Sequence, residues 1–172
     1  MKKLHAHCAQ ALAGAALLTL SAVAWSAGGH DGGHGGDGHG HSHGGFSFGE
    51  PAQADAADRT VEIAADEMDF SPESVQVEAG ETVRFVVENT GQVQHAFTLG
   101  TPEGQVEHEQ EMQGMPMEKM AHHMRDEPNG LVVQPGETKS LTWRFAEGGP
   151  VQFACHIPGH YPAGMKGRVR VN

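Results

Sequence analysis

Basic residues are scarce in this 172-residue sequence, where 11 Lys and Arg stand against 22 Asp and Glu and the formal net charge is -11. A surface of that sign repels phosphate backbones, so we expect no nucleic-acid partner. Long apolar runs are scarce as well. The one such run, residues 11–23, is shorter than the about 20 residues that a membrane-spanning helix needs. The composition therefore favours a water-soluble protein with no integral membrane segment in its mature form.

The apolar run has the features of an N-terminal export signal. Lys2 and Lys3 provide the positive start, and Ala22-Val23-Ala24, or alternatively Ala27, supplies small residues before a cleavage point. We predict that residues 1–27 are a cleaved signal peptide and that the mature chain is periplasmic; an uncleaved anchor is the alternative.

Cysteine is nearly absent, with Cys8 and Cys155 as the two examples. Cleavage of the signal peptide would remove Cys8, so no disulfide could form within the mature chain. A lone thiol in an oxidising compartment is a metal ligand, a reactive thiol or one half of an intermolecular bridge. Cys155 is thus a candidate functional residue.

Apolar residues are almost missing between Gly28 and Gly49, where Gly, His and Asp dominate. Such a segment cannot bury a core, so we predict a disordered tail and linker over residues 28–58. A dense set of histidines in a flexible tract indicates metal binding, and a soluble linker enriched in His by chance is the alternative. These histidines are His30, His34, His39, His41 and His43.

From Arg59 onward, apolar residues alternate with polar ones, which is typical of half-buried strands. The alternating sets are Val61 and Ile63; Val75 and Val77; Val83, Phe85 and Val87; Leu131 and Val133; Leu141, Trp143 and Phe145; Val151 and Phe153; Val169 and Val171. Gly, Pro and Asn turns separate them. Seven or so short strands at this spacing predict an all-β domain over residues 59–172, an antiparallel sandwich or barrel.

The alternation is interrupted over residues 101–130, an insertion rich in Met and His. Met117, Met120 and Met124 have helical spacing, which predicts a short helix from about Pro116 to Arg125. Its methionines either pack against the sandwich or, with the histidines, form a second copper site, because thioethers select Cu(I). The candidate ligands for that site are Met112, Met115, Met117, Met120, His122, His123 and Met124.

The strongest motif is the loop Cys155-His-Ile-Pro-Gly-His160-Tyr-Pro-Ala-Gly-Met165 between two predicted strands. It brings together a thiolate, an imidazole and a thioether. His95, which follows the strand over residues 83–88, is the best candidate for a second imidazole; His108, His122 and His123 are competing candidates. Two imidazoles, a thiolate and a weak axial thioether define a blue-copper electron-transfer centre.

This loop resembles the C-terminal copper loop of cupredoxins. Its spacing is similar to that of rusticyanin, while the His-rich tail and the Met/His insertion resemble periplasmic copper-tolerance cupredoxins. The resemblance implies an eight-stranded Greek-key β-sandwich with one type 1 copper at one end, bound by His95, Cys155, His160 and Met165, and His160 exposed as the electron port. In many cupredoxins an Asn or Ser follows the first histidine, whereas here Ala96 does; its backbone N–H can still reach the thiolate.

His156, beside Cys155, raises the question of an enzyme. Multicopper oxidases flank this cysteine with histidines on both sides, but here Ala154 precedes it. We interpret His156 as a loop residue rather than a ligand, since a second centre would need several more fixed ligands.

Three functional hypotheses follow. The first is a periplasmic copper-tolerance protein that binds copper and cycles between Cu(II) and Cu(I). The second is a dedicated electron carrier that exchanges electrons with a partner such as a c-type cytochrome, and the third is a cuprous oxidase. Copper is the expected cofactor in all three, with one type 1 ion and additional ions in the tail and insertion.

Overall fold

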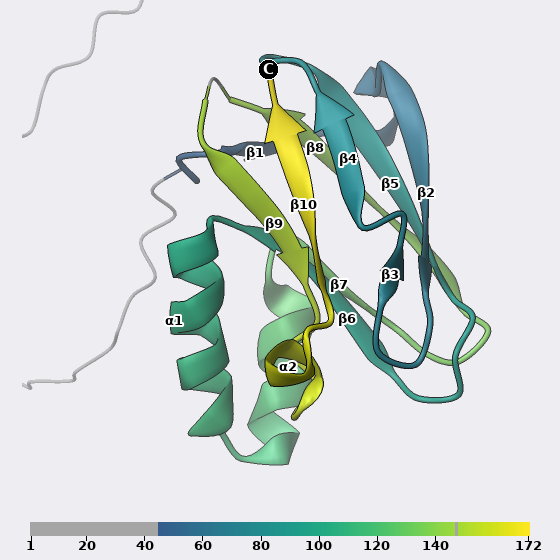
Figure 1. Ribbon diagram of the computed structural model, residues 1–172, viewed down its shortest axis with the longest axis vertical. Helices are drawn as coiled ribbons and strands as arrows, with labels where there is room; N and C mark the ends of the chain where they lie inside the picture. The colour runs from purple at the N-terminus through teal and green to yellow at the C-terminus, as the bar shows by residue number, and fades with distance from the viewer. Residues whose placement is uncertain (1–44, 147) are drawn as a thin grey trace, which may run out of the picture. The chain divides into compact units, whose positions relative to one another are not determined.

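A computed structural model describes residues 45–146 and 148–172, which form two five-stranded sheets packed face to face (Figure 1). The first sheet has the order β1-β8-β5-β2-β3 and the second β4-β10-β9-β6-β7. The strands are β1 (Gly49–Pro51), β2 (Arg59–Ala65), β3 (Phe70–Ser71), β4 (Ser74–Val77), β5 (Thr82–Asn89), β6 (His95–Gly100), β7 (Gly130–Val133), β8 (Thr138–Phe145), β9 (Pro150–Ala154) and β10 (Lys166–Val171). The predicted β-sandwich is confirmed. Its sheets are mixed rather than purely antiparallel, because β2 pairs with β5, and β10 with β4, in parallel.

Period-two alternation produces the strands of the first sheet. In β5, Val83, Phe85 and Val87 point inward and are fully buried, as the alternation predicts. The core is aromatic where the sheets meet: the ring centroids of Phe85 and Phe97 lie 5.4 Å apart, and Phe97 stacks on Phe153 at 5.2 Å. Offset-stacked aromatic pairs such as Phe97 and Phe153 stabilise a core beyond the area they bury.

The folded domain begins before Arg59, which differs from the predicted linker over residues 28–58. Phe46 and Phe48 pack on Trp143, with ring centroids 5.2 and 5.1 Å away, and β1 pairs antiparallel with β8. A 3-10 turn (Ala54–Ala56) follows. Burial of these two rings fixes the segment to the first sheet. The predicted signal peptide and the histidines of the predicted tail lie outside the described residues.

The insertion between β6 and β7 contains two helices, α1 (Pro102–Gln113) and α2 (Met117–Asp126), which lie along the second sheet (Figure 1). The predicted helix over 116–125 is confirmed as α2. Helix α1 was not predicted, although Thr101 caps it by accepting a hydrogen bond from the N–H of Gly104 at 3.1 Å.

The methionines of the insertion divide into two groups. Met112, Met120 and Met124 are buried in the hydrophobic core, so for these three the packing interpretation holds. Met115 is half-buried against that core. Met117 begins α2, but its side chain is not among those described. Within residues 45–146 and 148–172, no helix is long and apolar enough to cross a membrane.

Candidate metal centre

Three predicted ligands meet at one end of the sandwich. His95 begins β6, Cys155 follows β9, and His160 begins the short helix α3 (His160–Ala163). The Cys155 Sγ lies 3.4 Å from the His160 Nδ1 and 3.9 Å from the His95 Nδ1, and all three donor atoms lie within 4.8 Å of one another. His95 thus occupies the position of the second imidazole, and the competing candidates His108 and His123 lie in a different cluster.

Backbone hydrogen bonds shape the loop that carries the other ligands. Gly159 and Gly164 flank α3 with φ of 90° and 104°, a left-handed conformation that favours glycine. The N–H of Met165 donates to the carbonyl of His160 at 3.0 Å, and the N–H of Cys155 donates to the carbonyl of Met165 at 3.1 Å. The loop therefore closes with Met165 beside Cys155, and the Met165 side chain is completely buried.

The neighbouring strand supports the sulfur atom. The N–H of Ala96 donates to the Cys155 Sγ at 3.3 Å, which confirms the prediction that this backbone N–H can reach the sulfur. A hydrogen bond to a ligand sulfur fixes its orientation and tunes the metal that it binds. The strand that supplies His95 therefore also positions the thiol.

Burial controls the ionisation of all three groups. It raises the pKa of Cys155 to about 11, although the Ala96 N–H works in the opposite direction. Burial also lowers the pKa of His95 and His160, and their mutual proximity lowers that of His95 further. Both imidazoles are consequently neutral near pH 7 and offer lone pairs, whereas the thiol keeps its proton until a cation displaces it.

The donor set fits a single metal ion. Bonds of the length found in zinc sites, about 2.0–2.3 Å, separate a sulfur and a nitrogen donor by roughly 3.5–4 Å in a trigonal array. The two sulfur–nitrogen distances of 3.4 and 3.9 Å are of that size. The Nε2 of His95 is buried without a hydrogen-bond partner among the described residues. His160, expected to be exposed, is in fact only 8% exposed.

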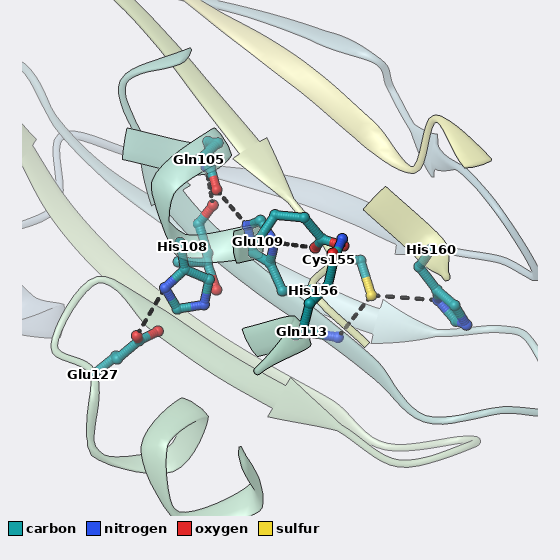
Figure 2. A network of polar contacts seen from close by, with 10 residues as sticks. Gln105, His108, Glu109, Gln113, Glu127, Cys155, His156 and His160 are labelled. Atoms are coloured by element: carbon teal, nitrogen blue, oxygen red, sulfur yellow. Dashed lines mark hydrogen bonds and ion pairs between the residues drawn. The ribbon is translucent and has the colours of Figure 1, made fainter. Parts of the chain in front are cut away.

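His156 is the main surprise of the loop, because it is a buried residue held by α1 (Figure 2). Its Nδ1 lies 2.9 Å from the Glu109 Oε2, and its Nε2 lies 2.6 Å from the Gln105 Oε1. The Gln105 Nε2 donates to the carbonyls of Thr98 and Gln152. That donation fixes the orientation of the Gln105 amide, so its oxygen accepts from His156. His156 is a structural link between the copper loop and the insertion.

Gln105 and Glu109 were missed by sequence reasoning. They lie at i and i+4 of α1, and with Met112 they form its buried face, so this face is mostly polar. Hydrophobic periodicity cannot detect such a helix. The signal that could have revealed it is the start sequence Thr101-Pro102, a cap followed by proline at the first helical position.

A second group of candidate ligands lies further from the sandwich, where His108, His123 and Glu127 form a cluster. Burial, together with His156 and His123, lowers the pKa of His108 to about 3. Burial and the charge of Glu111 raise the pKa of Glu127 to about 7. His122, also predicted as a secondary ligand, is exposed and does not belong to this cluster.

Comparison with known proteins identifies the family. A family model described as copper binding proteins of the plastocyanin/azurin family matches residues 57–172. The chain belongs to the plastocyanin/azurin family. This membership agrees with the His-Cys-His cluster and makes copper the metal of the site, as predicted.

The chain is similar in sequence to copper-resistance proteins and in fold to a solved structure named auracyanin B. The copper-resistant cuproprotein CopI of Pseudomonas aeruginosa is 39% identical, and the match covers 74% of this chain and 83% of the relative. CopI of Rubrivivax gelatinosus is 42% identical over 72% of this chain and 73% of the relative. Auracyanin B is similar in structure, with a TM-score of 0.59, 29% identity and coverage of 73% of this chain and 96% of its own.

Proposed function

We propose that this chain is a periplasmic type 1 copper protein of copper tolerance that binds copper through His95, Cys155, His160 and Met165 and cycles between Cu(II) and Cu(I). The convergence of two neutral imidazoles and a buried thiol carries this proposal. Copper in such a site supplies one-electron redox chemistry. The names of the CopI relatives support the role in copper tolerance.

The surrounding protein favours a ligand geometry that changes little with oxidation state. His95 pairs with Val133 of β7, and the same strand pairs with β9 from Thr98 onward, so ladders on both sides hold the strand that carries His95. Cys155 is tied to both Ala96 and Met165 by backbone hydrogen bonds. Fixed donors limit the rearrangement that accompanies a change of charge, which suits rapid one-electron exchange.

An optical spectrum of the copper-loaded full-length chain tests the site. We expect an intense copper–thiolate charge-transfer band in the visible region that is lost in Cys155→Ser. His122→Gln, at an exposed histidine, is the matched control and should keep the band. Absence of the band in the folded, copper-loaded wild type would overturn the proposed site.

Copper tolerance is tested separately in cells. Loss of the gene should slow growth in copper, and Cys155→Ser should fail to restore it. If the protein were a dedicated electron carrier, loss of the gene would cause no such growth defect, and the protein would exchange electrons rapidly with a c-type cytochrome.

The histidines of the tail add to the same role by binding further copper. Deletion of residues 28–49 should lower the number of copper ions bound by the full chain, and an unchanged number would contradict storage by the tail.

A cuprous oxidase is a second candidate, favoured by a groove of about 410 Å³ between the helices and the copper loop. Its lining includes the half-buried Met115 together with Pro158 and Gly159 of the loop. Thioethers select Cu(I), here as substrate. Each Cu(I) would give one electron to Cu(II) held at the type 1 site, and an external acceptor such as dioxygen would take that electron up in turn. Oxidation of added Cu(I) should then fall in Met115→Ala, the half-buried position, while the copper–thiolate band persists. An unchanged rate in Met115→Ala would argue against this activity.

A further inference from the structure

The two helices of the insertion hold a second group of metal-binding side chains, which we call the helix cluster: His108 of α1, His123 of α2, and Glu127 directly after α2. The Glu127 Oε1 lies 3.2 Å from the His108 Nδ1 and 3.1 Å from the His123 Nε2. One donor atom from each of the three residues lies within 4.8 Å of the others. The His108 and His123 rings stack, with centroids 5.6 Å apart.

These distances match the needs of a small cation. Tetrahedral bonds of about 2.0–2.1 Å place neighbouring donor atoms about 3.3 Å apart. The two nitrogen–oxygen distances in the helix cluster differ from this value by only a few tenths of an ångström. A bound ion would therefore require small side-chain rotations rather than rearrangement of the helices.

The helix cluster also holds polar atoms that the protein itself leaves unused. The Nε2 of His108 and the Oε2 of Glu127 are buried, and neither has a hydrogen-bond partner among the described residues. Their side chains are only 13% and 16% exposed. Buried polar atoms without partners are destabilising, and a bound ion is one way to satisfy them. With its pKa at about 3, His108 is neutral near pH 7 and has a lone pair to offer.

We propose that His108, His123 and Glu127 form a second metal site for a divalent transition-metal ion, Cu²⁺ or Zn²⁺. Two imidazoles and a carboxylate are donors for such ions, whereas Cu(I) selects soft sulfur. Three protein ligands leave a fourth position for water. The site is separate from the one at Cys155. Its donor set also differs from the predicted methionine-rich site, because Met112, Met120 and Met124 are used in the core.

A ring contact connects the helix cluster to the copper loop. The ring of His108 lies 4.4 Å from the ring of His156, centroid to centroid, and His156 directly follows Cys155. Occupation of the helix cluster is therefore expected to perturb the copper–thiolate band slightly in energy, which gives a second readout.

Zinc binding by the full-length chain loaded with one equivalent of copper tests the proposal, because zinc is distinguishable from the copper already at Cys155. Isothermal titration should show one equivalent of zinc fewer in His123→Gln and in Glu127→Gln than in the wild type. His122→Gln, one residue before His123 and exposed, is the matched control and should keep the wild-type stoichiometry. Retention of the copper–thiolate band shows that each variant is folded.

Crystals grown with zinc provide an independent measurement. An anomalous peak at the zinc edge is expected between the three side chains in the wild type and should be absent in Glu127→Gln. Equal zinc stoichiometry in all variants, or zinc only at other sites in the wild-type crystal, would overturn the proposal. A copper–thiolate band missing from the copper-loaded wild type would instead count against the type 1 site, so the two failures are distinguishable.

Discussion

Replacing His156 with alanine should destabilise the protein by about 3–5 kcal/mol, which is a large effect for a residue that binds no metal in our proposal. Its side chain is completely buried and has oxygen atoms at both ring nitrogens, from Glu109 and Gln105. Because the Gln105 amide is oriented by its own donor bonds, the His156 Nε2 must donate to it. The other ring nitrogen, Nδ1, lies 2.9 Å from the Oε2 of Glu109.

The magnitude follows from what alanine leaves behind. The lost bond to the neutral Gln105 oxygen contributes about 1 kcal/mol, and the lost bond to the Glu109 carboxylate about 1.5–3 kcal/mol. The Glu109 side chain is only 10% exposed, so its oxygen would remain buried without that partner. The cavity left by the ring adds to the loss.

Urea unfolding of the reduced, metal-free, full-length chain measures this effect, followed by tryptophan fluorescence. A double-mutant cycle with Glu109→Ala should give a coupling energy of about 1.5–3 kcal/mol, since each variant removes the same contact. His122→Ala, at an exposed position, should change stability by less than about 0.5 kcal/mol. A loss below about 1 kcal/mol in His156→Ala, or additive losses in the cycle, would refute the reasoning.

Three further predictions concern the core, the thiol and the N-terminal segment. Gly167→Ala should destabilise the protein by more than about 3 kcal/mol, because the added methyl group would overlap the ring of Phe153. Gly114→Ala is the control, because its methyl group meets only ordinary contacts. Equal urea midpoints for the two variants would contradict this prediction. The affinity of the metal-free chain for Cu(I) should rise about tenfold per pH unit between about pH 7 and pH 9, because the pKa of Cys155 is about 11 and binding releases its proton. A competition titration measures this affinity, and an affinity that does not change with pH would refute the prediction. Phe48→Ala should cost about 3–5 kcal/mol in the same unfolding assay if the segment before Arg59 is part of the fold, and no loss would show that it is not.

The sequence patterns that succeeded are those in which one side of an element is buried. Strand β5 alternates between core and surface, and Leu141, Trp143 and Phe145 of β8 are buried at every second position, so period-two reasoning located both strands. Helix α2 was located by the spacing of Met117, Met120 and Met124. In these elements, the residues that tertiary structure buries are the ones that the local sequence pattern predicts to be buried.

The elements that escaped prediction are buried in other ways. Every residue of β6 is buried, so the strand that carries His95 shows no alternation. Helix α1 turns Gln105 and Glu109 inward, which no hydrophobic pattern can show. The aromatic pair before Gly49 was hidden at the edge of a glycine-rich tract, where composition outweighed two residues that pack on Trp143.

The ligands of the candidate site could be predicted from the sequence, but the residues that hold the ligand loop in place could not. Cys155, His160 and Met165 lie in one short loop, so their proximity follows from the chain itself, and His95 was chosen because a strand end could present it. The roles of His156, Gln105 and Glu109 depend on a helix docking from outside the loop. Docking of that kind depends on tertiary structure, and local sequence does not encode it.

The attachment of α1 to His156 limits how this protein can be shortened. Strands β6 and β7 are antiparallel neighbours, so a tight turn could in principle join them in place of the whole helical segment. Such a trimmed chain would expose the imidazole of His156, the residue directly after Cys155, and would leave it without a fixed orientation. Helix α1 thus supports the loop that carries Cys155, and a minimal version of this domain would need a new partner for the His156 ring.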